Sequence, residues 1–140
     1  MLISLGTRSI TVSTPYAGER TPLPLLLYRS LGEGENALRR NDVRRDLAYL
    51  LQNGYTAVSE QELLAALRRE APLPAQPVVL LFDDANPAFA AEVLPVLQEA
   101  ELPWFPLRKA TALSQELRTA GYPVTRLERM AGIAMEEYDF

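Results

Sequence analysis

Apolar residues gather along the chain in short uncharged runs that have the length of β-strands. The clearest runs are residues 25–28 and 78–82, and shorter ones lie at 55–58, at 104–107 and at the stretch that begins at 123. Uninterrupted apolar runs of this length are typical of strands that are buried on both faces of a sheet. The pattern therefore predicts a sheet with a buried centre, made mostly of short strands.

Between these runs the apolar positions change to helical spacing. Val43, Leu47, Leu50 and Leu51 form one stripe along a helix, with Asn41 as its expected N-cap and Gly54 as its expected stop. The helices predicted in this way cover residues 41–53, 59–69, 86–100 and 111–120.

Local signals mark where the later helices begin. Ser59 and Glu62 have the spacing of a capping box, and Asn86 with Pro87 provides an N-cap followed by a proline at the first helical position. Pro95 is expected to kink or restart the third helix. Strands that alternate with helices predict an α/β fold with a mostly parallel sheet and crossover helices.

We expect one domain over residues 1–140, without a linker or an internal repeat. Short β-rich segments around Gly6 predict a hairpin within residues 1–14. The acidic tail, residues 135–140, is expected to be loose.

Composition excludes several classes of function. The chain has 18 acidic and 14 basic residues and a formal charge of −4, so nucleic acid is not an expected partner. One basic cluster is interpreted as the solvated face of the first helix. It consists of Arg39, Arg40, Arg44 and Arg45, interrupted by Asn41, Asp42 and Asp46.

The chain contains no cysteine and no histidine. Thiolate metal sites, cysteine nucleophiles, Ser-His-Asp triads and histidine-ligated zinc are therefore excluded within one copy of the chain. No apolar run is long enough to cross a bilayer, and residues 1–12 do not have the pattern of a signal peptide, so we expect a cytoplasmic protein without a membrane partner.

Three segments combine into a recognisable order. They are residues 25–28 followed by 46–59, residues 77–84 followed by 93–97 and 102–103, and residues 117–124. Together they resemble the polysaccharide deacetylase family, also called the NodB-homology domain or carbohydrate esterase family 4, over roughly residues 25–125. The resemblance implies a distorted barrel of parallel strands and metal-dependent removal of acetyl groups from N-acetylated sugars.

The resemblance also implies site residues. Asp83 matches the family's catalytic base, and Asp84 matches its metal-binding aspartate. The two histidine ligands of the family fall near Leu127 and Ala131, whose side chains cannot bind a metal. Later family motifs have no counterpart in the chain, so we expect an incomplete NodB-like barrel with an open sheet edge.

The mouth of this site is expected to include Tyr28, Arg29 and Asn86. We predict that Arg29 pairs with the two aspartates in place of a metal. We favour a structural interpretation of Asp84 over a retained metal site, with its carboxylate bound to loop amides and helping Asn86 to cap the following helix. No cofactor is expected; the carboxylates leave open a weak Mg²⁺ or Ca²⁺ site and argue against zinc.

Aromatic residues near the site are interpreted as core rather than as a sugar-stacking platform; these are Trp104, Phe105 and Tyr122. We therefore expect a degenerate deacetylase-like domain without hydrolytic activity of its own and with a binding or interaction role. Its expected partners are carbohydrate and a second copy that closes the sheet edge. Two alternatives stay open: a hydrolase of N-acetylated sugars that uses Asp83 and Asp84, with an unusual metal site or ligands from another polypeptide, and a truncated gene product without selected function.

Overall fold

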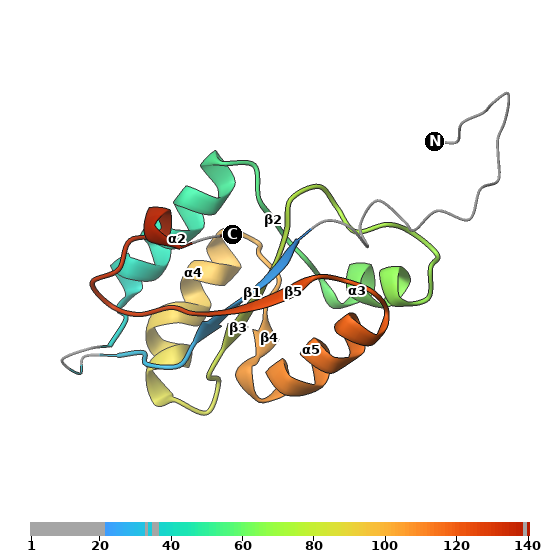
Figure 1. Cartoon of the computed structure of the whole chain (residues 1–140). Helices are drawn as coiled ribbons and strands as arrows, with labels where there is room; N and C mark the ends of the chain where they lie inside the picture. Colours follow the sequence, from blue (N-terminus) through green and yellow to red (C-terminus); the bar gives the residue numbers. More distant parts are fainter. Residues whose placement is uncertain (1–21, 33, 35–36, 139) are drawn as a thin grey trace, which may run out of the picture.

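The computed structural model describes residues 22–32, 34, 37–138 and 140. Strands and helices alternate along this part of the chain, as Figure 1 shows. The strands are β1 (Leu23–Tyr28), β2 (Thr56–Ala57), β3 (Pro77–Phe82), β4 (Phe105–Pro106) and β5 (Val124–Glu128). The helices are α2 (Arg40–Gln52), α3 (Glu60–Leu67), α4 (Leu94–Glu99) and α5 (Ala110–Thr119), with shorter helical segments at Phe89–Val93, Leu107–Lys109 and Met135–Glu137.

The five strands of the described residues are all parallel and belong to one sheet. Its order is β2-β3-β1-β5, and β4 also pairs with β3. β1 and β3 lie at the centre, in a register that pairs Leu25 with Val79 and Tyr28 with Phe82. Every residue of these two strands is buried, which agrees with their uninterrupted apolar sequences. The predicted α/β class and parallel sheet are confirmed.

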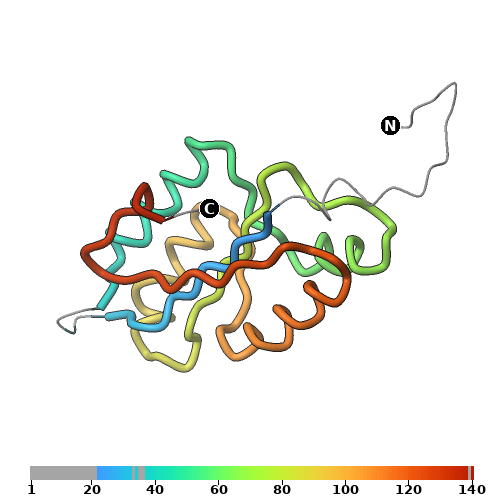
Figure 2. Tube along the Cα trace, in the orientation of Figure 1, coloured from blue at the N-terminus to red at the C-terminus, as the bar shows by residue number. Residues whose placement is uncertain are grey.

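Helices cover both faces of the sheet, and alternate residues of each central strand face opposite layers. Leu26, Leu80 and Phe82 belong to a core cluster that includes residues of α2 and α4. Leu25 and Leu81 belong to a second cluster that includes residues of α3 and α5. The two helical layers lie on opposite sides of the central strands in Figures 1 and 2.

The capping signals in the sequence are confirmed at α3 and wrong in detail at α2. Ser59 and Glu62 form the predicted capping box, with the Ser59 hydroxyl accepting a hydrogen bond from the Glu62 amide. At α2 the expected N-cap Asn41 lies inside the helix, which begins at Arg40, and Leu51 of the expected apolar stripe is 56% exposed. The Asp42 carboxylate accepts the amide of Arg39, one residue before the helix, and so satisfies a backbone donor there.

Pro95 restarts its helix as predicted. The chain forms a π-helical turn over Phe89–Val93, and Pro95 lies at the beginning of α4. Proline has no amide hydrogen, so it fits the first turn of a helix, where that donor would have no helical partner. Val93 and Leu97 are buried, and Leu94 is half-buried.

The C-terminal segment is not loose, and this prediction was wrong. Met135 is buried in the core cluster beside α2, and the Tyr55 and Phe140 rings lie 5.1 Å apart. Tyr138 donates its hydroxyl to the Glu128 carbonyl at 2.7 Å and accepts the Met130 amide at 2.9 Å. These apolar and polar contacts hold the segment against the domain.

Tyr138 occupies part of the outer edge of β5. The Arg129 amide bonds inward to Leu27 on β1, so the Glu128 carbonyl and the Met130 amide face away from the sheet. Arg118 donates to the outward carbonyl of Val124 at 3.3 Å. Side chains therefore occupy both ends of an edge that would otherwise be open.

The predicted N-terminal hairpin of residues 1–14 lies outside the described residues. Within the described part of the chain, every helix is too short or too polar to cross a membrane.

Candidate functional site

The two family-matching aspartates follow β3 at the carboxyl end of the sheet, where parallel α/β folds place their chemistry. Asp84 is not free there. The Arg108 guanidinium, which follows β4, donates from one nitrogen to both carboxylate oxygens of Asp84 at 3.1 Å. A cationic side chain therefore already compensates the charge of the aspartate at the metal-ligand position.

Asp83 and Asn86 shape the turn that follows β3. The Asp83 carboxylate accepts the Ala85 amide at 3.1 Å, which closes a local turn. Asn86 accepts the Ala88 amide at 2.9 Å and donates to the Leu31 carbonyl at 3.1 Å. The structural interpretation expected Asp84 to bind loop amides, but Asp83 takes that place. Asn86 bonds the backbone of the following segment as expected of a cap.

Arg29 does not compensate the aspartates, so that prediction was wrong. Its Nε donates to both carboxylate oxygens of Glu128, at 2.5 and 3.0 Å. The two side chains extend from the ends of the neighbouring strands β1 and β5 and are about half exposed, at 51% and 48%. Glu128 was overlooked because strand pairing, which a single sequence does not show, brings it next to Arg29.

Leu127 and Ala131, at the positions where the family resemblance would place histidines, pack against the core cluster on the α2 side. Neither side chain has an atom that can donate an electron pair to a metal ion. Among the described residues, no group of three acidic, cysteine or histidine side chains is placed to hold a metal ion. Asp83 and Asp84 alone do not fit Zn²⁺, which needs three or four protein ligands and prefers imidazole or thiolate.

A buried polar network links the carboxyl ends of β1 and β5 to α2. Asp46 on α2 accepts hydrogen bonds from the Tyr28 hydroxyl at 2.9 Å and from two nitrogens of Arg129 at 2.6 and 2.8 Å. The side chains of Arg129 and Asp46 are only 3% and 4% exposed. Arg129 also donates to the Ile133 carbonyl at 2.7 Å and stacks on the Tyr138 ring.

Burial and the charged partners together shift the pKa values of this network. Burial raises the pKa of the Tyr28 phenol well above its usual value, and the neighbouring Asp46 charge and hydrogen bond raise it further. Burial also raises the pKa of Asp46, although the hydrogen bonds and charge of Arg129 act in the opposite direction. Burial by itself would lower the pKa of Arg129, but Asp46 outweighs it and keeps that pKa above its ordinary value.

Comparison with known proteins identifies the fold that holds these residues. A stretch of 73 residues, 51% of the chain, is 38% identical to the poly-beta-1,6-N-acetyl-D-glucosamine N-deacetylase of Escherichia coli (strain K12). IcaB from Ammonifex degensii superposes with a TM-score of 0.52 at 21% identity, over 76% of this chain and 52% of that one. The chain has a NodB-like polysaccharide deacetylase fold. The resemblance predicted from the sequence is confirmed.

A second solved structure gives the same result for the NodB-like domain. A de-N-acetylase from Aggregatibacter actinomycetemcomitans superposes with a TM-score of 0.53 at 19% identity, over 76% of this chain and 54% of that one. The matched region makes up 11% of the Escherichia coli relative, and the chain spans about half of each solved structure. The sequence matches no family model.

The polar network of the NodB-like domain was missed by sequence reasoning, although a signal was present. Asp46 lies three residues after Val43 and four before Leu50, within the apolar stripe of α2, but it was grouped with the solvated arginines. An acidic residue on the buried side of a helix needs a partner. Arg129 could not be paired with it in advance, because the two lie 83 positions apart.

Tyr28 makes the network testable by alkaline titration. Its folded pKa lies above the value of about 10 for a free phenol, so the folded state keeps a proton that the unfolded state loses. Its contribution to stability is therefore intact below about pH 10 and is lost as the pH rises further. In the unchanged protein, phenolate absorbance should show a late titration step above the main one. In Tyr28→Phe, this late step should be smaller by the absorbance of one tyrosine. Loss of that absorbance from the main phenolate step, with the late step unchanged, would contradict this assignment.

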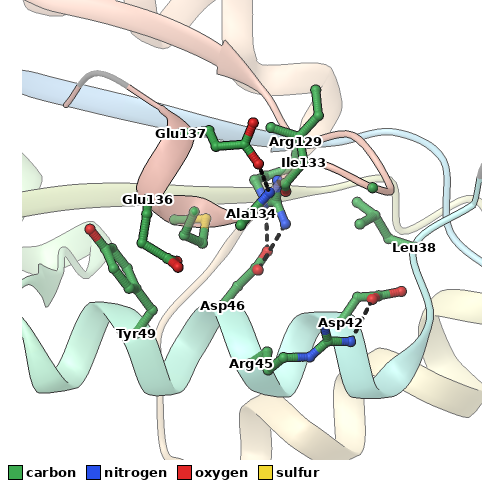
Figure 3. Close-up of a pocket in the computed structure, with 12 residues that line it drawn as sticks. Leu38, Asp42, Arg45, Asp46, Tyr49, Arg129, Ile133, Ala134, Glu136 and Glu137 are labelled. Carbon is green, nitrogen blue, oxygen red and sulfur yellow. Dashed lines mark hydrogen bonds and ion pairs between the residues drawn. The ribbon is translucent and has the colours of Figure 1, made fainter.

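A groove of about 390 Å³ lies above this network, between α2 and the C-terminal segment, and we call it the α2 groove. Figure 3 shows Tyr49 extending from α2 and Glu136 extending from the opposite segment into the same space. Asp46 and Arg129 form part of its lining. The NodB-like domain therefore has a hollow apart from Asp83 and Asp84, which do not line it.

Proposed function

We propose that this NodB-like domain does not hydrolyse acetylated sugars by itself and has a binding or interaction role, with carbohydrate as the ligand class. The similarity to a poly-beta-1,6-N-acetyl-D-glucosamine N-deacetylase supports the ligand class. The side chains at the family's catalytic positions support the loss of hydrolysis.

The lack of ligand atoms at Leu127 and Ala131 carries the proposal, and the solvent-accessible contact between Arg108 and Asp84 supports it. Amide hydrolysis on this fold is expected to need a metal ion that polarises the carbonyl group and activates water. In this chain a guanidinium pairs with the one metal-ligand position that keeps a carboxylate. Arginine stays protonated in proteins, so it supplies a fixed positive charge but no open coordination position.

The other ligand positions and the base position of the family site also support the loss of hydrolysis. Leu127 and Ala131 contribute apolar surface to the core where ligands would be needed. Asp83 keeps a carboxylate at the position of the base, but that carboxylate closes a backbone turn. A base without an activated water or a polarised carbonyl contributes little to amide cleavage.

The expected homodimer would find fewer free backbone groups on the outer edge of β5 than the sequence implied. Arg118 and Tyr138 occupy outward backbone groups at both ends of β5, which leaves only a short central stretch for pairing. We therefore propose carbohydrate rather than a second copy as the principal partner. Light scattering at micromolar concentration should show a monomer, and a stable dimer would contradict this preference.

An acetate-release assay tests the absence of hydrolysis. With N-acetylglucosamine oligomers and added Zn²⁺, Co²⁺, Mg²⁺ or Ca²⁺, we expect no acetate above the protein-free blank. Asp83→Asn should behave as the unchanged protein does, because the carboxylate performs no catalytic step. Metal analysis after dialysis should find no stoichiometric divalent ion.

The opposite result would establish the competing function. Metal-dependent acetate release that disappears in Asp83→Asn would show a working hydrolase. Glu60→Gln on α3 serves as the matched control, because it removes one exposed carboxylate from another element. Activity that survives in Glu60→Gln but not in Asp83→Asn would assign the reaction to this site.

A further inference from the structure

The α2 groove has the dimensions of a ligand site. Its volume of about 390 Å³ lies within the range of roughly 300 to 1,000 Å³ that small-molecule sites occupy. One wall comes from α2 and the other from the C-terminal segment, which Arg129 ties to α2 through Asp46 and the Ile133 carbonyl. The hollow is therefore held between two elements that are fixed to each other.

The charges in the groove do not cancel. Its ionisable side chains are Asp42, Asp46, Glu136 and Glu137 against Arg45 and Arg129. Four carboxylates and two guanidinium groups leave two negative charges, and the groove therefore favours a cationic ligand. Among the described residues, the Glu136 carboxylate has no hydrogen bond or ion pair, so it remains available.

These carboxylates are not arranged for a metal ion. Asp42 pairs with Arg45 at 2.9 Å, Asp46 is held by Arg129, and Glu137 accepts the Ala134 amide at 3.0 Å. No three acidic side chains of the described chain converge on one point that a cation could occupy. The available negative charge suits a single hydrogen-bonding cation better than a metal, which needs several converging oxygens.

Tyr49 gives the groove an aromatic wall. The ring is partly buried against the core cluster, and Figure 3 shows it beside Glu136. An aromatic face attracts a cation through its negative centre and packs against apolar surface such as the C–H face of a sugar ring. An aromatic ring beside a free carboxylate therefore matches a ligand that combines a ring with a protonated amine.

We propose that the α2 groove binds an amine-bearing sugar unit, with Glu136 contacting the ammonium group and Tyr49 contacting the ring. This inference rests on the proposed binding role and names its ligand. Removal of an acetyl group turns a neutral acetamide into a protonated amine. The groove therefore distinguishes deacetylated sugar from acetylated sugar by charge.

Calorimetric titration of the 140-residue chain with three probes tests the ligand class. A glucosamine tetramer should bind about tenfold more tightly than an N-acetylglucosamine tetramer, and its binding should weaken as salt screens the attraction. A tetralysine peptide presents amines without sugar rings and should bind more weakly than the glucosamine tetramer. Equal binding of the two sugars, stronger binding of tetralysine, or no binding of glucosamine would overturn the inference.

Glu136→Gln locates the site. The side chain is exposed and makes no described polar contact, so the variant should fold normally and bind the glucosamine tetramer about two- to fivefold more weakly. Glu60→Gln removes the same charge from α3, outside the groove, and should leave the affinity unchanged. An unchanged affinity in Glu136→Gln would overturn the assignment of the groove.

These outcomes are separable from the proposed function. Acetate release decides whether the domain hydrolyses sugars, whatever the groove binds. Binding of glucosamine that Glu136→Gln does not weaken would preserve a carbohydrate-binding role and move it to another surface. Absence of any sugar binding, together with absence of acetate release, would remove the carbohydrate role and leave the loss of hydrolysis standing.

Discussion

Replacing Arg129 with methionine is expected to lower the free energy of unfolding by about 3 to 5 kcal/mol. The change leaves the Asp46 carboxylate buried without its cation, and it removes the hydrogen bond to the Ile133 carbonyl that holds the C-terminal segment. Urea denaturation followed by circular dichroism would measure the loss. This is the largest electrostatic effect that we expect in the described chain.

Arg29→Met provides a matched control. Arg29 also forms an ion pair with two short contacts to a carboxylate, but both partners are about half exposed. Water replaces such a contact at little cost, so the expected loss is below about 1 kcal/mol. Equal losses in the two variants would show that burial does not set the strength of these ion pairs.

Removing one member of the network is expected to lower the free energy of unfolding more than replacing all of its members by apolar side chains. In a variant that combines Asp46→Leu, Arg129→Met and Tyr28→Phe, no buried polar side chain of the network is left without a partner. Apolar replacement of a complete buried network is often neutral or stabilising, so this variant should recover most of the stability that Arg129→Met loses. A combined variant less stable than Arg129→Met would show that the polar contacts themselves stabilise the fold.

Phe82→Ala is expected to destabilise the domain by about 3 to 5 kcal/mol. Phe82 is fully buried at the end of β3, where its ring stacks on Tyr28 with centroids 4.4 Å apart and planes 15° from parallel. The ring also packs against Phe89 at 5.8 Å. Truncation would leave a cavity at the centre of the α2-side core, and thermal or urea unfolding would report its cost.

Met130→Ala is the control for apolar truncation. Met130 is 55% exposed, so its removal should change the free energy of unfolding by less than about 0.5 kcal/mol. A loss below about 1.5 kcal/mol in Phe82→Ala would mean that neighbouring side chains fill the space. The core at the end of β3 would then be more adaptable than its stacked rings indicate.

The sequence was sufficient for the main elements of the fold because local signals and tertiary packing agree there. The uncharged strand of residues 78–82 became β3, and Ser59 with Glu62 capped α3 as their spacing predicted. Pro95 restarted α4 for the same local reason. At α2 the capping signal failed, since Asp42 could satisfy the Arg39 amide from inside the helix.

The site was harder to predict because long-range charge pairing decides it. The sequence placed Asp83 and Asp84 at the end of a buried strand, and the structure places them there. It did not show that Arg108 would reach Asp84, or that Arg29 would pair with Glu128 across neighbouring strands. Each arginine had several carboxylates available, and only the three-dimensional arrangement selects among them.

The position of Tyr138 has a consequence for the behaviour of the domain at high concentration. An exposed strand edge recruits identical edges and can begin open-ended fibrous assembly. Here one phenol hydroxyl bonds two outward backbone groups, and Arg129 beneath its ring links that contact to the buried ion pair. Protection against aggregation is therefore coupled to the integrity of the interior, and damage to the core would expose the surface that recruits further copies.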